Sequence, residues 1–259
     1  MTSNFLIRLS TRAPLTCCIN ETDGDRGNCL PRMPLIAVLC GGIGARLRPL
    51  TENIPKPLVS VNGKPIIEYI VDDLERAGLE QIVLLGGYKV ELLQAHFKSK
   101  PEIRITDTGE VDIARRLESV VPLVHDFAIV LYGDTISDIN FGKLLEYFSL
   151  DPTRPVATVW QLKSDFGLFD VSADGVVQSY EEKPRLDKWI NIGYMCLPLG
   201  DMMMLNRFKT FEDFLSNLVD SRRLRAFKHD GIHITINTRE QLDAAESFLA
   251  NKIDGSEYD

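Results

Sequence analysis

The sequence lacks the features of several protein classes. No apolar run reaches the roughly 20 residues that cross a bilayer, so we expect neither a membrane span nor a membrane partner. A net charge of −8 argues against non-specific nucleic-acid binding, which needs a basic face. The five cysteines are odd in number and have no CxxC spacing. They favour reduced thiols and a cytoplasmic location over a disulfide framework or a zinc site.

Two familiar nucleotide-binding motifs are also absent. A Walker loop requires Gly-Lys-Ser/Thr where this chain has Ala45-Arg46-Leu47. A dinucleotide fingerprint requires a third glycine at the position of Leu47, which disfavours a nicotinamide-dependent oxidoreductase. The few histidines have no spacing typical of a triad or a metal site, so we expect surface or packing roles for them. They are His96, His125, His229 and His233.

The length of 259 residues fits one large domain with small appendages. Residues 1–32 lack clear periodicity, and we expect a disordered N-terminal extension there, with the domain over residues 33–254. Arg8 and Arg12 precede any acidic residue, as in a transit peptide. Met33 stands directly before the first predicted strand, which indicates an over-extended reading frame, and we favour this second interpretation.

Strands and helices alternate from Leu35 onward. Short apolar runs predict strands at 35–39, 82–85, 103–106, 128–132 and 156–162, and helical spacing predicts helices at 65–77, 90–97 and 141–148. Later segments predict an antiparallel hairpin at 168–180, strands at 190–197, 224–228 and 233–236, and helices at 211–221 and 239–251. The pattern predicts a three-layer α/β fold with a mixed, mainly parallel sheet and a small hairpin.

A glycine-rich loop follows the first strand. Gly41, Gly42 and Gly44 let the backbone approach a ligand and direct N–H groups at phosphate oxygens. Arg46 adds a bidentate fork, and two prolines hold Lys56 in a stiff Pro-Lys-Pro segment. Together these residues predict a triphosphate site, with Arg46 and Lys56 in the catalytic positions.

Gly133-Asp134 ends a predicted buried strand at the sheet edge where α/β proteins bind ligands. A carboxylate oxygen at this edge suits Mg²⁺, so Asp134 is the candidate metal ligand. Asp138 is a nearby competitor that we instead interpret as a helix N-cap.

The pattern GGxGxRLxPLT followed by PKPL resembles the sugar-1-phosphate nucleotidylyltransferase family, from about Leu35 to about Leu249. The resemblance implies a Rossmann-like nucleotidyltransferase fold and a Mg²⁺-dependent reaction. In that reaction a sugar 1-phosphate oxygen attacks the α-phosphorus of an NTP, and pyrophosphate leaves. It also places Leu39 at the nucleotide. The expected partners are an NTP, a sugar 1-phosphate and further copies of the chain in a homo-oligomer.

The resemblance extends to the sugar side of the site. Glu182 and Lys183 stand where the family has an EKP motif, in which the glutamate contacts sugar hydroxyls and the lysine the sugar phosphate. Further matches to sugar-side motifs are Phe166, Gly167, Asn191 and Gly193. A cytidylyltransferase for a phosphorylated alcohol would share the loop but lack these motifs.

Within the family, Asp107-Thr108-Gly109 is similar to the glucose-1-phosphate cytidylyltransferase branch, where it lies beside the base. The resemblance therefore assigns Thr108 and Gly109 to the nucleotide and favours CTP. The segment before Arg116-Leu117 lacks the glycine pair of that branch, and guanylyl, thymidylyl and uridylyl transfer stay open.

Asn237 stands where the family has a second metal-binding aspartate. Its carbonyl oxygen can bind a cation but lacks the charge of a carboxylate. Three alternatives follow: Asp134 and the phosphates suffice, Asp230 compensates, or activity is reduced. The last would make the chain a weakly active regulatory or binding homologue.

Overall fold

The computed structural model describes residues 33–253, so the predicted extension over residues 1–32 lies outside the described residues. A seven-stranded sheet has the order β12-β8-β11-β6-β1-β4-β5. Strand β11 is antiparallel to β6 and β8, and the other neighbours are parallel. The predicted mixed, mainly parallel sheet is confirmed. The strands are β1 Leu35–Leu39, β4 Ile82–Gly86, β5 Arg104–Asp107, β6 Phe127–Tyr132, β8 Val156–Lys163, β11 Arg185–Pro198 and β12 Arg225–His229.

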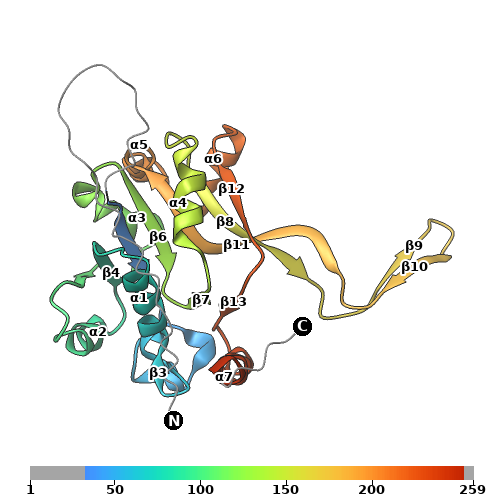
Figure 1. Ribbon diagram of the computed structural model, residues 1–259, viewed down its shortest axis with the longest axis horizontal. Helices are drawn as coiled ribbons and strands as arrows, with labels where there is room; N and C mark the ends of the chain where they lie inside the picture. Colours follow the sequence, from blue (N-terminus) through green and yellow to red (C-terminus); the bar gives the residue numbers. More distant parts are fainter. Residues whose placement is uncertain (1–32, 254–259) are drawn as a thin grey trace, which may run out of the picture.

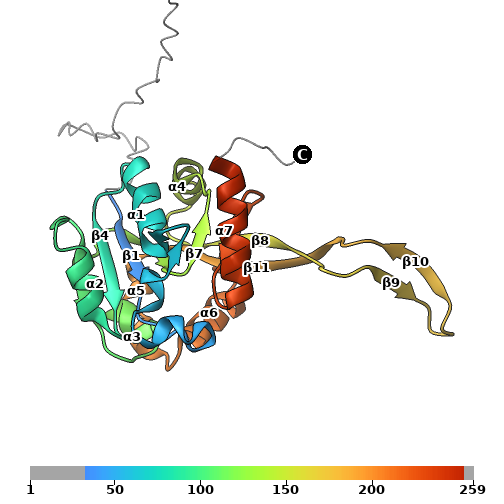
Figure 2. The same cartoon turned by 90° about the horizontal axis from the view of Figure 1, so that it is seen from below.

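Helices cover both faces of the sheet and complete the predicted three layers (Figures 1 and 2). One face packs against α1 Ile66–Arg76, α2 Val90–His96, α4 Phe141–Ser149 and α7 Arg239–Ile253. The other packs against α3 Ile113–Glu118, α5 Leu199–Met202 and α6 Phe211–Asp220. Strand β1 contributes Ile36 and Val38 to the first core and Leu35 and Ala37 to the second, which explains its unbroken apolar sequence. None of the described helices has the length and apolar character needed to cross a membrane.

Local sequence explains where the helices start and stop. Helix α6 begins with a capping box, in which the Thr210 hydroxyl accepts from the Asp213 N–H and the Asp213 carboxylate accepts from the Thr210 N–H. Helix α1 is followed by Gly78 in the left-handed conformation that ends many helices. Helix α4 is capped by Asn140, whose side chain accepts from the Lys143 N–H at 3.0 Å.

The prediction that Asp138 is a helix N-cap is therefore wrong. Its carboxylate accepts from the Ile232 N–H at 2.6 Å and lies 3.2 Å from His229, so it connects two loops instead of starting a helix. The short helix α3 was not predicted from the sequence. Only six residues long, it has too few turns to display helical periodicity.

Two short strands outside the main sheet, β7 and β13, bring the two predicted metal ligands together. β7 Thr135–Ser137 pairs antiparallel with β13 His233–Thr235, with Thr135 opposite Thr235. The Ile236 N–H donates to the Asp134 carbonyl at 3.1 Å. This pairing brings Asn237 beside Asp134 across a hundred residues of sequence. A further short pair joins β2 Ser60–Val61 to β3 Lys64–Pro65.

The predicted hairpin is also confirmed. β9 Leu168–Val171 pairs antiparallel with β10 Val177–Glu181, and in the described chain these strands pair only with each other. The outer parts of β8 and β11 carry the hairpin away from the body of the molecule (Figures 1 and 2). Strand β11 begins five residues earlier than predicted, at Arg185, because it extends into this projection.

Candidate active site

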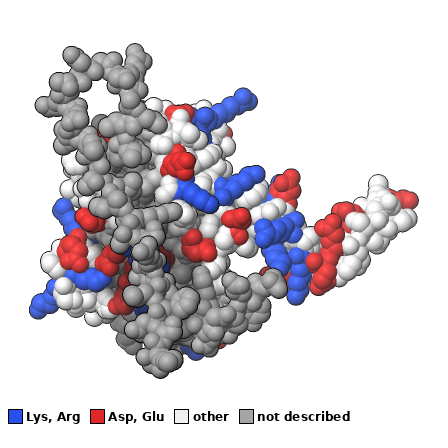
Figure 3. All heavy atoms as spheres, in the orientation of Figure 1, with Lys and Arg blue, Asp and Glu red and all other residues white. Residues whose placement is uncertain are grey.

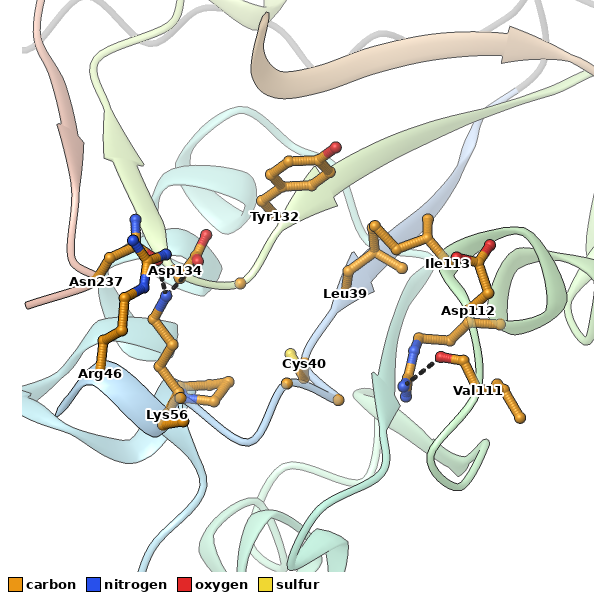
Figure 4. Close-up of a pocket in the computed structure, with 17 residues that line it drawn as sticks. Leu39, Cys40, Arg46, Lys56, Val111, Asp112, Ile113, Tyr132, Asp134 and Asn237 are labelled. Atoms are coloured by element: carbon orange, nitrogen blue, oxygen red, sulfur yellow. Dashed lines mark hydrogen bonds and ion pairs between the residues drawn. The ribbon is translucent and has the colours of Figure 1, made fainter. Parts of the chain in front are cut away.

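A pocket of about 530 Å³ opens where β1 and β6 end. Leu39 and Tyr132 are the last residues of these two neighbouring parallel strands, and both line it. Figure 4 shows two ends of the pocket, with Cys40 between them. Arg46, Lys56, Asp134 and Asn237 form one end, and Val111, Asp112 and Ile113 lie at the other. The carboxyl edge of a parallel sheet is where α/β proteins bind their ligands.

The glycine-rich loop forms the wall between the two ends. Gly44 adopts a left-handed conformation with φ of 65°, and its carbonyl accepts from the Thr51 hydroxyl at 2.8 Å. A Cβ at Gly44 would lie 3.1 Å from the Cβ of Lys56. Backbone shape and close packing therefore both require glycine here, and they fix the loop against the base of the Lys56 side chain.

Lys56 joins the two candidate metal ligands. Its ammonium group donates to the Asp134 carboxylate and, at 2.7 Å, to the amide oxygen of Asn237. Lys56 is only 8% exposed, and the Asp134 side chain is 26% exposed. A partly dry site strengthens this charge pairing and would also strengthen pairing to a phosphate. Because both oxygens contact one ammonium group, they are close enough to face a single cation.

Arg116 lines the other end of the pocket and was missed in the sequence analysis. Its guanidinium donates to the Gly86 carbonyl at 2.7 Å, to the Val111 carbonyl at 3.1 Å, and to the Thr108 hydroxyl. A Cβ at Gly41 would lie 1.7 Å from Nη1 of Arg116, so Gly41 provides space for the guanidinium. Burial lowers the pKa of Arg116 below its ordinary value, with nearby acids opposing the effect.

Cys40 lies on the pocket wall but is buried, and burial strongly raises the pKa of its thiol. The Asp134 carboxylate raises that pKa further, because a thiolate beside an anion is disfavoured. Burial and Asp134 likewise raise the pKa of the Tyr132 hydroxyl. These shifts favour the protonated thiol and the protonated hydroxyl, which are poor nucleophiles and bases.

The predicted nucleotide and metal residues mostly gather in one place. The lining includes Leu39, Gly41, Gly42, Gly44, Arg46, Lys56, Asp134 and Asn237. Thr108 and Gly109 are absent from the lining, but Thr108 is bonded to Arg116, which belongs to it, and the Gly109 carbonyl faces Gly87. Asp230 is exposed and absent from the lining. The described residues contain no group of three or more His, Cys, Asp or Glu that would form a protein-only metal site.

The predicted sugar-side residues lie outside this lining. Four of them, Phe166, Gly167, Glu182 and Lys183, lie on the projecting arm, the name used here for residues 163–188 around the β9–β10 hairpin. On this arm Glu182 accepts from the Tyr180 hydroxyl, and Phe166 is 76% exposed. Asn191 and Gly193 are nearer, on β11. A Cβ at Gly193 would lie 2.4 Å from the ring of Tyr132, which does line the pocket.

The fold and the pocket define a Rossmann-like α/β protein whose candidate site combines a glycine loop, a buried lysine and an acid at the sheet edge. The Nucleotidyl transferase family matches residues 36–217, so the chain belongs to this family of enzymes. This confirms the resemblance drawn from the glycine loop and the PKPL segment.

Individual relatives extend the comparison. The chain is 30% identical to a Campylobacter jejuni D-glycero-alpha-D-manno-heptose 1-phosphate guanylyltransferase, covering 78% of this chain and 94% of the relative. It is 29% identical to a Bacillus subtilis probable glucose-1-phosphate cytidylyltransferase, covering 79% and 92%. It is 27% identical to the bifunctional protein GlmU of Methanocaldococcus jannaschii, covering 83% of this chain but only 54% of that protein.

Solved structures share the fold. A putative glucose-1-phosphate thymidylyltransferase from Bacillus anthracis has a TM-score of 0.67 at 18% identity, covering 87% of this chain and 97% of that one. HddC from Yersinia pseudotuberculosis, complexed with GMP-PN, has a TM-score of 0.66 at 22% identity, covering 84% and 100%. At these identities the likeness supports the nucleotidyltransferase fold alone.

Proposed function

We propose that the chain joins a nucleoside triphosphate to a sugar 1-phosphate, releasing pyrophosphate. The observation that carries the proposal is Lys56, a buried cation held by Asp134 and Asn237 at the mouth of the glycine loop. Named relatives that act on a heptose 1-phosphate and a glucose 1-phosphate support the sugar phosphate as the second substrate.

In this reaction an oxygen of the sugar phosphate attacks the α-phosphorus of the NTP. A new P–O bond forms, the bond to the β-phosphate breaks, and pyrophosphate carries away the negative charge. Such transfers are driven mainly by positioning and by neutralising charge around phosphorus. Lys56 would donate to the phosphate oxygens, Arg46 would add a bidentate fork from the exposed rim, and the N–H groups of Gly41–Gly44 would line the phosphate path.

The residues present fit Mg²⁺. Asp134 and Asn237 offer two oxygen donors that already face the Lys56 ammonium group. Mg²⁺ is commonly held by one or two such protein oxygens together with substrate phosphates. Bound there, it would neutralise charge on the triphosphate. Asp134 and Asn237 would orient it, and Lys56 would turn from these oxygens toward the substrate.

Arg116 supports the choice of base. Nη2 carries two hydrogens and donates one of them to the Val111 carbonyl, and Nε carries a single hydrogen; among the described residues, neither the second Nη2 hydrogen nor the Nε hydrogen has a protein acceptor. Cytosine presents two neighbouring acceptors, O2 and N3, whereas uracil and thymine carry a hydrogen on N3. If the base occupies the end of the pocket beside Val111, Asp112 and Arg116, the arginine would therefore favour CTP over UTP or dTTP. Guanine also presents paired acceptors, so GTP is the alternative, and the relatives include both a cytidylyl and a guanylyl enzyme.

Two substitutions test the proposed roles. Lys56→Ala removes the phosphate donor and Asp134→Asn removes the one charged metal ligand, so each should lower the rate of pyrophosphate release by about 10²–10³-fold. Lys64→Ala is the matched control, because Lys64 pairs with Asp72 and does not line the pocket. Retained activity in both site variants would overturn the assignment.

A melting-temperature measurement beside the pyrophosphate assay tests the alternative that Asn237 suggests, a regulatory or binding homologue. A regulatory homologue would show a nucleotide-dependent rise in melting temperature without pyrophosphate release from any sugar 1-phosphate. A cytoplasmic location is also proposed, because the cysteine pattern favours reduced thiols and the structure has Cys40 and Cys196 as free thiols. A homo-oligomer is likewise proposed, on the resemblance to the family.

A further inference from the structure

The metal end of the pocket has one charged candidate ligand, Asp134, and one neutral candidate ligand, Asn237. A carboxylate has two charged oxygens, whereas an amide can present its single oxygen to a cation in only one orientation. Asp112, the other acid of the lining, lies at the opposite end of the pocket (Figure 4). The arm carries further acids, but Figure 3 shows those of the visible face on a segment that stands clear of the body. The orientation of Asn237 is therefore decisive for holding a cation here.

Asn237 lies in a short connection between two elements. Strand β13 ends at Thr235, and helix α7 begins at Arg239. Just before Asn237, the Ile236 N–H donates to the Asp134 carbonyl at 3.1 Å, and Ile236 is fully buried. This contact fixes the chain on the side where it enters Asn237. The backbone N–H of Asn237 needs a separate partner, because the residue belongs to no strand or helix.

That partner is Gln241, in the first turn of α7. Thr238 directly precedes the helix, and its hydroxyl accepts from the Gln241 N–H at 3.3 Å, as the first residue of a capping box does. In an ordinary capping box, the side chain of the third helical residue accepts in return from the N–H of the cap. Here the Gln241 side chain reaches one residue further back and accepts from the Asn237 N–H at 2.7 Å. One glutamine therefore connects the backbone of the neutral ligand to helix α7.

Helix α7 is itself held firmly against the rest of the chain. Leu242 and Ala245 are buried in the core between this helix and the sheet. The Asn62 side chain, in the turn between β2 and β3, donates to the Glu246 carbonyl at 2.8 Å. Gln241 therefore ties Asn237 to an element that has its own fixed place in the fold.

We propose that Gln241 is a positioning residue, which holds the backbone of Asn237 so that its amide oxygen faces the cation beside Asp134. The proposal deepens the function proposed above and rests on it for the identity of the cation and the nucleotide. Gln241 lies outside the pocket lining, so it acts through Asn237 and not by contact with the substrate. Removing a group that orients a metal ligand typically lowers metal affinity by about 10–100-fold.

The test measures how strongly Mg²⁺ increases nucleotide affinity. The full chain is titrated with the α,β-methylene analogues of CTP and GTP, which the transfer cannot cleave, first in Mg²⁺ and then in EDTA. The ratio of the EDTA dissociation constant to the Mg²⁺ dissociation constant isolates the contribution of the metal, because a general loosening of the pocket would weaken binding in both conditions. Gln241→Ala should lower this ratio by about 10-fold and change the dissociation constant in EDTA by less than about twofold.

Two further variants separate positioning from charge. Gln241→Glu keeps an acceptor at the same reach, so it should keep the wild-type ratio or exceed it. Gln241→Asp carries the same added charge on a side chain one methylene shorter, which cannot reach the Asn237 N–H, so it should behave like Gln241→Ala. Gln94→Ala is the matched control, because Gln94 is an exposed glutamine on α2 outside the pocket lining, and it should keep both dissociation constants.

Several results would overturn the proposal. They are a wild-type ratio in Gln241→Ala, a loss in Gln241→Glu as large as in the alanine variant, and a wild-type ratio in Gln241→Asp. A wild-type chain whose nucleotide affinity does not depend on Mg²⁺ would overturn it as well. Failure of the proposed reaction gives a different result, in which Mg²⁺ raises the nucleotide affinity of the wild type but no sugar 1-phosphate leads to pyrophosphate release.

Discussion

The absence of a side chain at Gly41 makes room for the Arg116 guanidinium in the pocket wall. The sequence predicts a phosphate-binding role for Gly41, yet a Cβ added there would overlap the Arg116 guanidinium. The glycine therefore has a packing role as well as its proposed ligand role. Only a structure could show this, because Arg116 is 75 residues away in the chain and its hydrogen bonds lead to two separate segments, the end of β4 at Gly86 and the loop that holds Thr108 and Val111.

Gly41→Ala tests this packing role. The new methyl group would overlap Arg116, so we expect the free energy of unfolding to fall by about 1–3 kcal/mol, as overpacked cores do. Gly42→Ala is the matched control, since a Cβ there meets nothing within 4 Å, and it should change stability by less than about 0.5 kcal/mol. Urea denaturation at equilibrium measures both.

A double-mutant cycle identifies the cause. In an Arg116→Ala background the clash is absent, so Gly41→Ala should then cost much less than in the wild type. Equal costs in both backgrounds would show that Arg116 does not set the requirement for glycine.

At the scale of elements, periodicity and capping residues predicted most of the fold. The buried strands 35–39 and 128–132 and the helix after Pro65 lie where the apolar spacing placed them. The exceptions have local physical causes. Helix α3 is too short for a periodic signal, and Asn140 is a better placed cap than Asp138 because its side chain reaches the Lys143 N–H.

Helix α6 offers a quantitative test at this scale. Thr210→Ala removes the hydroxyl that accepts from the Asp213 N–H at 3.1 Å, so we expect a loss of about 1 kcal/mol of stability. Asn217→Ala, on the exposed side of the same helix, should change stability by less than about 0.5 kcal/mol. Denaturant midpoints at unchanged slope measure the difference. A Thr210 variant as stable as wild type would show that the cap contributes nothing.

For the whole molecule, the structure brings most of the residues expected at the triphosphate into one pocket and leaves the residues expected at the sugar outside its lining. The loop residues and Lys56 are close in sequence, whereas Asn237 reaches Asp134 only through the pairing of β7 with β13. The expected sugar residues Glu182 and Lys183 instead lie on the arm. Their position depends on how the arm packs, and residue patterns carry no signal for that.

The central claim is that this pocket transfers a nucleotidyl group to a sugar 1-phosphate. The most direct test incubates the chain and Mg²⁺ with each of CTP, GTP, UTP, dTTP and ATP, crossed with a panel of sugar 1-phosphates, and measures pyrophosphate. We predict release only when both substrates are present, fastest with CTP, and loss of release in Lys56→Ala. Absence of pyrophosphate from every pair, in protein that binds NTP, would contradict the account.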